Sequence, residues 1–429
     1  MTPDSTTTPD PSTKDTMTQH PAPDATPAES SSADQTDRVI LRTAQSETSG
    51  PGGPRDVIVV DDATGALIAE ALDSMAEYED ARVLSWSSSA ARTREIAAQF
   101  ADAIETGRLV VSDGHGPVPL EEFVAGADAY LALARLPKSL AALDDRARRL
   151  ARAAAAAGRE DLELVAGGRV KHMTRHQNDV LAGLFTEVRA SLGLGKSRAL
   201  LASGPCPDVE RATPAEGSAT VAVRGQEREL PLRAVGGVFG GASADVGSLL
   251  LLDALDRALR AAELGESGPG TPGAEGPEGF CAVDLGSGNG LLTAYLALAL
   301  PAARVVASDD DIDAVLSTRA TADALTGAED SGASTPTVEV TWDDALSQLP
   351  DRSADLVLLN PPFHDGTAID ATLVHGLLDA ASRVLRPGGQ LWMVHNSHLR
   401  YRAELERRVG PARQRARDRR FTVLSAERV

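Results

Sequence analysis

The segment from Phe280 to Leu300 constrains the fold of this chain more than any other. An apolar stretch, Phe280–Asp284, runs into the turn Leu285-Gly-Ser-Gly-Asn-Gly290, and an apolar helical stretch follows to Leu300. Glycine lets the backbone pass close to a ligand, and the start of a helix offers unpaired N–H groups to it. This order of strand, turn and helix predicts an α/β fold with a nucleotide-like cofactor at the turn.

The glycine spacing leaves the identity of that cofactor open. The pattern is Gly286-x-Gly288-x-Gly290, and a dinucleotide site with the pattern G-x-G-x-x-G is the competing interpretation. The predicted cofactor contacts here are Asp284, Gly286, Ser287, Gly288 and Gly290.

Acidic residues follow the next two predicted strands. Ala303–Ser308 ends at Asp309, where a carboxylate can accept both ribose hydroxyls of NAD or of S-adenosylmethionine. We predict Asp309 as the ribose ligand, with a helix cap as the alternative. After Thr337–Thr341, either Asp343 or Asp344 can bind the adenine amino group or cap a helix, and we select Asp344.

The motif Asn360-Pro-Pro-Phe363 follows the apolar strand Asp355–Leu359, at the sheet edge where parallel strands bind ligands. Because the prolines fix the backbone, the Pro361 carbonyl and the Asn360 side-chain oxygen can accept the two hydrogens of an exocyclic amine. Accepting them directs the nitrogen lone pair toward a sulfonium methyl group. Alone the motif is also compatible with a strand-ending turn.

Combined with the glycine turn, this motif predicts an S-adenosylmethionine-dependent methyltransferase that acts on a planar amino nitrogen. Phe363 would stack on the flat substrate. His364 can assist proton removal or cap a turn, and His395 and Asn396 are expected at the rim of the site. The predicted catalytic residues are Asn360, Pro361, Pro362 and Phe363, and Asn360 is also expected to contact the cofactor.

The first half of the chain has alternating strands and helices but no glycine-rich turn. The strand Asp56–Val60 is followed by a turn with one glycine, Gly65, which indicates a nucleotide-binding fold without a nucleotide site. Residues 1–54 are polar and rich in Pro, Thr, Ser and Asp, so a disordered tail is predicted there. Residues 205–225 are predicted as a linker, and 265–279 as an exposed loop.

Charge limits how the chain can contact nucleic acid. A net charge of −20 excludes binding through a basic overall field, so any contact must be local. Three basic clusters are available: Arg146–Arg152, Arg169–His176 and Arg402–Arg420. The first also fits a solvated helix face, and Lys171 in the second is our candidate substrate contact.

Two distant cysteines, an acidic start without a signal-peptide pattern and the absence of long apolar runs predict a cytoplasmic protein without a disulfide or bound metal and without a membrane segment. We expect a monomer.

Two longer segments extend these motifs: Asn360-Pro-Pro-Phe-His-Asp-Gly366, and Gly237–Phe239 followed by Ala244–Leu251. The first looks like the catalytic loop of the ribosomal RNA guanine-N2 methyltransferases, and the second resembles the segment before the glycine turn of that family. The resemblance implies that Asp245 and Gly247 help to enclose the cofactor. One departure is Gly240-Gly241, where the family typically has Ser-Arg.

In the first half, Leu136–Leu140 and Ala166–His172 resemble the amino-terminal domain of the branch that modifies large-subunit RNA. The resemblance implies two tandem Rossmann-like methyltransferase domains: a degenerate one over residues 55–225, for RNA recognition or stability, and a seven-stranded class I catalytic one over 226–429. It further implies methyl transfer from S-adenosylmethionine to guanine N2 in ribosomal RNA, free or in a pre-ribosomal particle.

Other substrates remain open on the same chemistry: a guanine of small-subunit ribosomal RNA, adenine N6 or a protein glutamine amide. A non-catalytic RNA-binding assembly factor is the alternative from another class.

Overall fold

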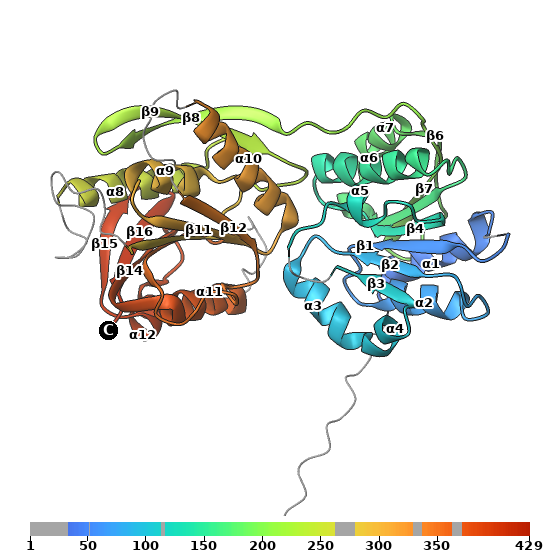
Figure 1. The fold of residues 1–429 in the computed structure, drawn as a ribbon, viewed down its shortest axis with the longest axis horizontal. Helices are drawn as coiled ribbons and strands as arrows, with labels where there is room; N and C mark the ends of the chain where they lie inside the picture. The colour runs from blue at the N-terminus through green and yellow to red at the C-terminus, as the bar shows by residue number, and fades with distance from the viewer. Residues whose placement is uncertain (1–32, 51, 113–115, 262–278, 329–336, 363–370) are drawn as a thin grey trace, which may run out of the picture. The chain divides into compact units, whose positions relative to one another are not determined.

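The computed structural model describes residues 33–50, 52–112, 116–261, 279–328, 337–362 and 371–429 (Figure 1). Its strands form two seven-stranded sheets and one two-stranded sheet. Among these residues, no helix has the length and apolar content needed to cross a membrane.

The first sheet has the strand order β3-β2-β1-β4-β5-β7-β6. Strands β1 to β5 are parallel, and β7 runs antiparallel to both β5 and β6. Its strands are β1 (Asp56–Val60), β2 (Val83–Trp86), β3 (Leu109–Val111), β4 (Ala129–Arg135), β5 (Glu163–Arg169), β6 (Phe185–Ala190) and β7 (Ser197–Pro205). The helices of this half are α1 (Gln35–Glu47), α2 (Ala66–Ser74), α3 (Ala90–Gln99), α4 (Ala101–Glu105), α5 (Leu120–Phe123), α6 (Leu140–Ala156), the short 3-10 helix η1 (Val170–His172) and α7 (Arg175–Ala182).

The second sheet repeats this order as β12-β11-β10-β13-β14-β16-β15. Here too one strand breaks the parallel arrangement, because β16 runs antiparallel to both β14 and β15. The strands are β10 (Cys281–Leu285), β11 (Arg304–Asp309), β12 (Thr337–Trp342), β13 (Ala354–Leu359), β14 (Leu385–Asn396), β15 (Ala412–Arg417) and β16 (Phe421–Glu427). The helices are α8 (Val246–Arg260), α9 (Leu291–Ala299), α10 (Ile312–Ala328), α11 (Ala371–Val384) and α12 (Arg402–Arg408). The predicted α/β fold with two Rossmann-like sheets is confirmed.

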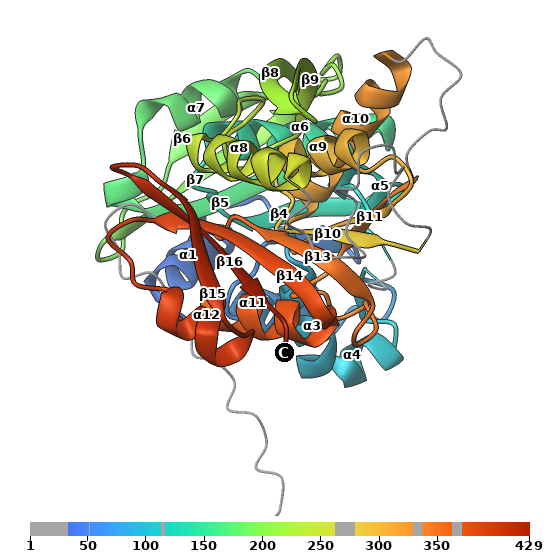
Figure 2. The same ribbon diagram turned by 90° about the vertical axis from the view of Figure 1, so that its left-hand side faces the viewer.

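Both sheets are covered by helices, which explains the apolar character of their central strands. Every residue of β1 and of β10 is buried. Helices α8 and α9 pack on one side of the second sheet, and α11 and α12 on the other (Figure 2). Because aromatic residues make up only 3% of the chain, Ala, Val and Leu form most of the core, with Trp392 and Tyr295 as its largest fully buried side chains.

Helix α1 lies inside the range predicted as a disordered tail, so that prediction is wrong for these residues. The helix packs on β5 and β7 and begins with a capping box in which Asp34 and Asp37 each accept the backbone N–H of the other. Its apolar content is small, because Val39 and Ile40 are its only fully buried large apolar residues. At the start of the helix, the buried residues Thr36 and Asp37 are held by hydrogen bonds to Ser197 and Arg135, which the composition could not indicate. Residues 1–32 lie outside the described residues.

The predicted linker, residues 205–225, also differs from the structure. Strand β8 (Ala215–Val223) pairs antiparallel with β9 (Gln226–Ala234) along its full length and forms a hairpin. This hairpin packs on α8, α9 and α10 (Figure 1). The ladder buries Leu230 and Leu232, so the second half of the supposed linker belongs to the fold of the carboxy-terminal half.

Candidate active site

The glycine turn connects β10 to α9 and faces open space. Gly286, Gly288 and Gly290 have φ angles of 78°, 54° and 82°, which favour glycine. A Cβ atom on Gly286 or Gly288 would meet nothing within 4 Å, whereas one on Gly290 would lie 3.0 Å from the Cα of Thr318 on α10. The first two glycines therefore leave room for a ligand, and the third allows the helices to pack.

Asp309, at the end of β11, holds the turn from the neighbouring strand. Its carboxylate accepts the backbone N–H of Gly288 at 3.0 Å and that of Asp311 at 2.9 Å. Burial raises the pKa of Asp309 to about 6, against the effect of these bonds. Asp311 accepts the N–H of Asp313 at 3.0 Å and so occupies the capping position of α10. Asp309 is thus not the helix cap, and its remaining lone pairs are available to ribose hydroxyls.

Asp284 is a fully buried carboxyl group beneath the turn. Thr293 Oγ1 donates to one of its oxygens at 2.6 Å, and the other oxygen has no hydrogen-bond partner among the described residues. Burial raises the pKa of Asp284 to about 7. A buried oxygen without a donor is costly, and a cationic ligand that donates a hydrogen bond would relieve it. S-adenosylmethionine, which has an amino group and a sulfonium, fits this turn.

Two further residues of the turn bind protein groups. Asn289 donates from Nδ2 to the carbonyl oxygens of Gly241 at 2.8 Å and Ser243 at 2.9 Å, and thereby fastens the segment before α8. The backbone N–H of Ser287 donates to Ser308, and its hydroxyl bonds to Thr318 at 2.9 Å. Ser287 is therefore committed to the fold. Asn289 was not predicted, although it lies inside the motif.

Asn360 lies directly after β13, beside the glycine turn, since Leu359 pairs with Leu285. Its Nδ2 donates to Asp245 Oδ2 at 3.0 Å and to Ser248 Oγ at 2.8 Å. Asp245 is the N-cap of α8 and accepts the Ser248 N–H at 2.9 Å. Asn360 and Asp245, predicted from different arguments, are thus in direct contact.

The rest of the motif is only partly described. Pro361 is buried and Pro362 is exposed, whereas Phe363 and His364 lie outside the described residues. Gly247 packs closely, because a Cβ there would come within 3.0 Å of Asp245 Oδ2 and 3.3 Å of Phe421.

The two candidates for the adenine contact differ in exposure. Asp343 is buried and accepts the N–H of Gln348 at 2.9 Å and the hydroxyl of Ser347. The side chain of Asp344 is 45% exposed, and burial still raises its pKa. Asp344 is accordingly the carboxylate that a ligand can reach. Arg94 of α3, which was not predicted, lies 3.5 Å from Asp343 and 3.6 Å from Asp344.

The predicted rim residues at the end of β14 have different positions. Asn396 is half-buried at the end of the strand. His395 is buried, packs edge-to-face against Tyr401 with ring centroids 5.5 Å apart, and has its pKa lowered by burial. The expectation for His395 is wrong, because strand alternation directs its ring into the core.

Lys171 lies in η1 within a group of exposed cations. The β5–β7 register places Arg198 opposite Gly168, and the Val170 N–H donates to the Lys196 carbonyl at 2.9 Å. We define the β5–β7 cation surface as the exposed residues Arg169, Lys171, Arg175, Lys196 and Arg198. None of them has a carboxylate partner among the residues that the structure describes. In contrast, the basic residues of the first cluster are all paired: Arg146 with Asp61, Arg148 with Asp144, Arg149 with Asp145 and Arg152 with Glu121.

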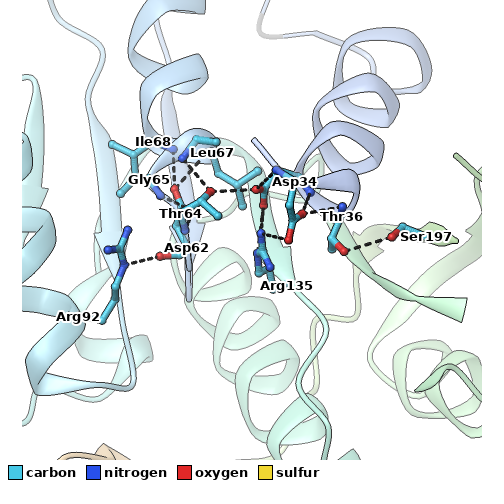
Figure 3. Close-up of polar contacts among 12 residues, drawn as sticks. Asp34, Thr36, Asp62, Thr64, Gly65, Leu67, Ile68, Arg92, Arg135 and Ser197 are labelled. Carbon is cyan, nitrogen blue, oxygen red and sulfur yellow. Dashed lines mark hydrogen bonds and ion pairs between the residues drawn. The ribbon is translucent and has the colours of Figure 1, made fainter. Parts of the chain in front are cut away.

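The counterpart of the glycine turn in the first half is filled by a side chain of the protein itself. Asp62 follows β1 and accepts four backbone N–H groups at the start of α2, as shown in Figure 3. The distances are 3.0 Å from Thr64, 2.9 Å from Gly65, and 3.0 Å from both Leu67 and Ile68. The backbone N–H groups that would bind a ligand at this position already donate to Asp62. This explains the absence of a glycine-rich turn there.

Two family models match the chain. Residues 11–206 match the RLMG N-terminal domain, and residues 229–425 match the methyltransferase small domain. The ribosomal RNA large subunit methyltransferase G of Streptomyces coelicolor is 33% identical over 300 residues, which is 68% of this chain and 71% of the relative. The protein of that name from Pseudomonas aeruginosa is 31% identical over 309 residues, 72% of this chain and 73% of the relative.

A solved structure has the same two-sheet fold. It is the T. thermophilus 16S rRNA N2 methyltransferase in complex with AdoMet and guanosine, which aligns with a TM-score of 0.67 and 24% sequence identity over 94% of each chain.

Proposed function

Because this chain belongs to the ribosomal RNA large subunit methyltransferase G family, we propose that it transfers a methyl group from S-adenosylmethionine to N2 of a guanine in large-subunit ribosomal RNA. One observation carries the chemistry. Both hydrogens of the Asn360 amide bind Asp245 and Ser248, and the amide oxygen has no partner among the described residues. An acceptor for a substrate amine therefore lies beside the cofactor turn.

Five residues form the proposed cofactor site. Gly286 and Gly288 would provide the space, Asp309 would accept hydrogen bonds from the ribose hydroxyls, and Asp344 from the adenine amino group. The unpartnered oxygen of Asp284 would accept from the methionine amino group. When bound there, S-adenosylmethionine supplies a methyl group on a positively charged sulfur.

The amide oxygen of Asn360 and the carbonyl oxygen of Pro361 accept the two hydrogens of guanine N2. This contact turns the nitrogen lone pair out of conjugation with the ring and fixes its direction. As the new N–C bond forms, the bond between the methyl group and sulfur breaks, which leaves S-adenosylhomocysteine. The nitrogen then loses one of these hydrogens to solvent as a proton. We assign the stacking role to Phe363 and substrate contacts to His364 and Asn396.

The β5–β7 cation surface provides the proposed RNA contact outside the active site. Exposed cations without carboxylate partners can neutralise phosphates, whereas the ion-paired arginines of α6 cannot do so without breaking their pairs. We assign RNA recognition to the degenerate first domain, which includes α1 and so extends before the predicted start at residue 55. We assign catalysis to the second domain, which includes β8 and so begins before the predicted residue 226.

We also propose that the protein acts as a monomer in the cytoplasm, on ribosomal RNA or on a pre-ribosomal particle. The free thiols Cys206 and Cys281 agree with a reducing compartment.

The test combines the purified chain and methyl-labelled S-adenosylmethionine with large-subunit ribosomal RNA from a strain that lacks the gene. We expect N2-methylguanosine as the labelled nucleoside on mass spectrometry. Label in small-subunit RNA, in N6-methyladenosine or in protein glutamine would contradict the proposal.

A further inference from the structure

The side-chain amide of Asn360 has two possible orientations, and only one of them suits the proposed reaction. Rotation by 180° exchanges the oxygen and the NH2 group, which have nearly the same shape but opposite hydrogen-bonding roles. With the oxygen toward the substrate, the amide accepts a hydrogen of the amine. With NH2 in its place, two donors would face each other.

The partners of Nδ2 distinguish these orientations to different degrees. The carboxylate of Asp245 can only accept a hydrogen bond, so an amide oxygen in place of Nδ2 would be repelled by it. The hydroxyl of Ser248 can donate or accept and tolerates both orientations. Asp245 therefore sets the orientation, and Ser248 adds a second contact.

The first turn of α8 fixes Asp245 itself. As N-cap, Asp245 accepts the N–H of Ser248 on the same Oδ2 that binds Asn360. Asp245 and Ser248 are three positions apart, so the cap geometry places both acceptors on the side of the helix that faces Asn360. A helix start and a strand end are joined by one carboxylate oxygen.

The first half of the chain repeats this arrangement independently. Asp34 is the N-cap of α1, Asp37 is three residues later, and Arg135 ends β4 at the position equivalent to Asn360. Arg135 donates to Asp34 at 3.1 Å and to Asp37 (Figure 3). The same scaffold thus binds a donor group from the strand in both halves, but arginine has no acceptor to offer in return.

From these contacts we infer that Asp245 and Ser248 are positioning residues that hold Asn360 with its oxygen toward the guanine amine. This inference rests on the proposed function and assigns Asp245 a role different from direct cofactor binding.

Two substitutions at position 245 separate the roles. Asp245→Asn keeps an acceptor oxygen for both bonds but removes the charge, whereas Asp245→Ser keeps the helix cap but offers a hydroxyl that tolerates either amide orientation. We expect kcat to fall less than about threefold in Asp245→Asn and at least about tenfold in Asp245→Ser, with KM for S-adenosylmethionine unchanged. Ser248→Ala should show a smaller loss of kcat than Asp245→Ser.

Asp34→Ser is the matched control, because it alters the equivalent cap and leaves Asn360 untouched. Its kcat should equal that of the wild type. Equal kcat in Asp245→Asn and Asp245→Ser would overturn the inference, as would a KM for S-adenosylmethionine raised tenfold in Asp245→Asn, which would make Asp245 a cofactor ligand. Should Asp245→Ser not fold, Asp245→Thr takes its place, since threonine also caps a helix and offers a hydroxyl. A kcat in Asp245→Thr equal to that of Asp245→Asn would then overturn the inference. A wild-type protein that does not form N2-methylguanosine would instead refute the proposed function.

Discussion

The two halves of the molecule share one architecture and differ at their ligand edge. Both sheets have the same strand order, and both turns after the first central strand end in a glycine at φ 82°, Gly65 in one half and Gly290 in the other. In the first half Asp62 occupies the helix start, and Arg135 stands at the position of Asn360, the proposed catalytic residue. A few side chains at one edge are thus enough to remove a site while the backbone persists.

The largest expected effect concerns Asn360, which lies directly after β13. Asn360→Ala removes an oriented acceptor, and we expect kcat to fall by about 10²–10³-fold, the loss typical of one preorganised hydrogen-bonding group. Cofactor affinity, measured by calorimetry, should stay the same.

The equivalent change in the first half should act on stability instead. Arg135→Gln weakens the ion pair of the fully buried Asp37, so the free energy of unfolding should fall by about 3 kcal/mol. A loss of kcat in the folded Arg135→Gln variant would show that the halves are not separated in this way.

The glycine turns provide the second comparison. In Gly286→Ala the new methyl group enters the space that faces the cofactor and forces a φ of 78° on alanine. We expect Kd for S-adenosylmethionine to rise at least about tenfold, because the methyl group occupies space that the ligand needs. The left-handed backbone costs alanine about 1–2 kcal/mol with or without the ligand, so Tm should fall as well. Gly65→Ala, also at positive φ, should lower Tm and leave this Kd unchanged.

A third comparison concerns pH, because the buried acids of the second half have raised pKa values. Burial brings the pKa of Asp284 to about 7 and that of Asp309 to about 6, so the folded protein holds protons there that an unfolded chain releases near pH 4. The free energy of unfolding of the ligand-free protein should therefore fall as pH rises from about 4 to about 7.

Cofactor binding should show the opposite dependence. A cationic ligand prefers ionised carboxylates, so its Kd should decrease about tenfold from pH 6 to pH 8, with proton release on binding. Calorimetry in buffers of different ionisation enthalpy measures both quantities. A Kd independent of pH in wild type, or a pH dependence unchanged in Asp284→Asn, would contradict this account.

The smallest effect is expected at the β5–β7 cation surface, the proposed RNA contact of the first half. Replacing Lys171, Lys196 and Arg198 by Ala should weaken binding to ribosomal RNA and reduce the slope of log K against log salt by about 0.7–0.9 for each phosphate that the protein no longer neutralises. Arg148→Ala and Arg152→Ala, which remove ion-paired cations, serve as controls. Equal slopes in all variants would exclude this surface.

The sequence predicted those parts of the site that are continuous in the chain. The glycine turn, Asp309 and Asn360 each follow a short apolar strand, and the sheet topology then brings them together. The sequence offered no physical reason to select Asp344 over Asp343. The structure supplies one, because Asp343 is buried and accepts hydrogen bonds from Gln348 and Ser347.

The partners that orient these residues were not predictable in the same way. Ser248 reaches Asn360 across 112 positions and Asn289 reaches Gly241 across 48, and neither has a local pattern that marks it. Helix α1 was missed for a related reason, because its buried polar residues Thr36 and Asp37 depend on partners far along the chain.

Asp62 also determines how many cofactor molecules one chain can hold. Its carboxylate is tethered next to the four N–H groups that it binds, so it competes at an effective concentration far above that of any dissolved metabolite. A free ligand cannot displace such an intramolecular competitor at cellular levels. A saturation experiment on the full chain should therefore end at a single equivalent of S-adenosylmethionine, despite the presence of two complete Rossmann-like sheets.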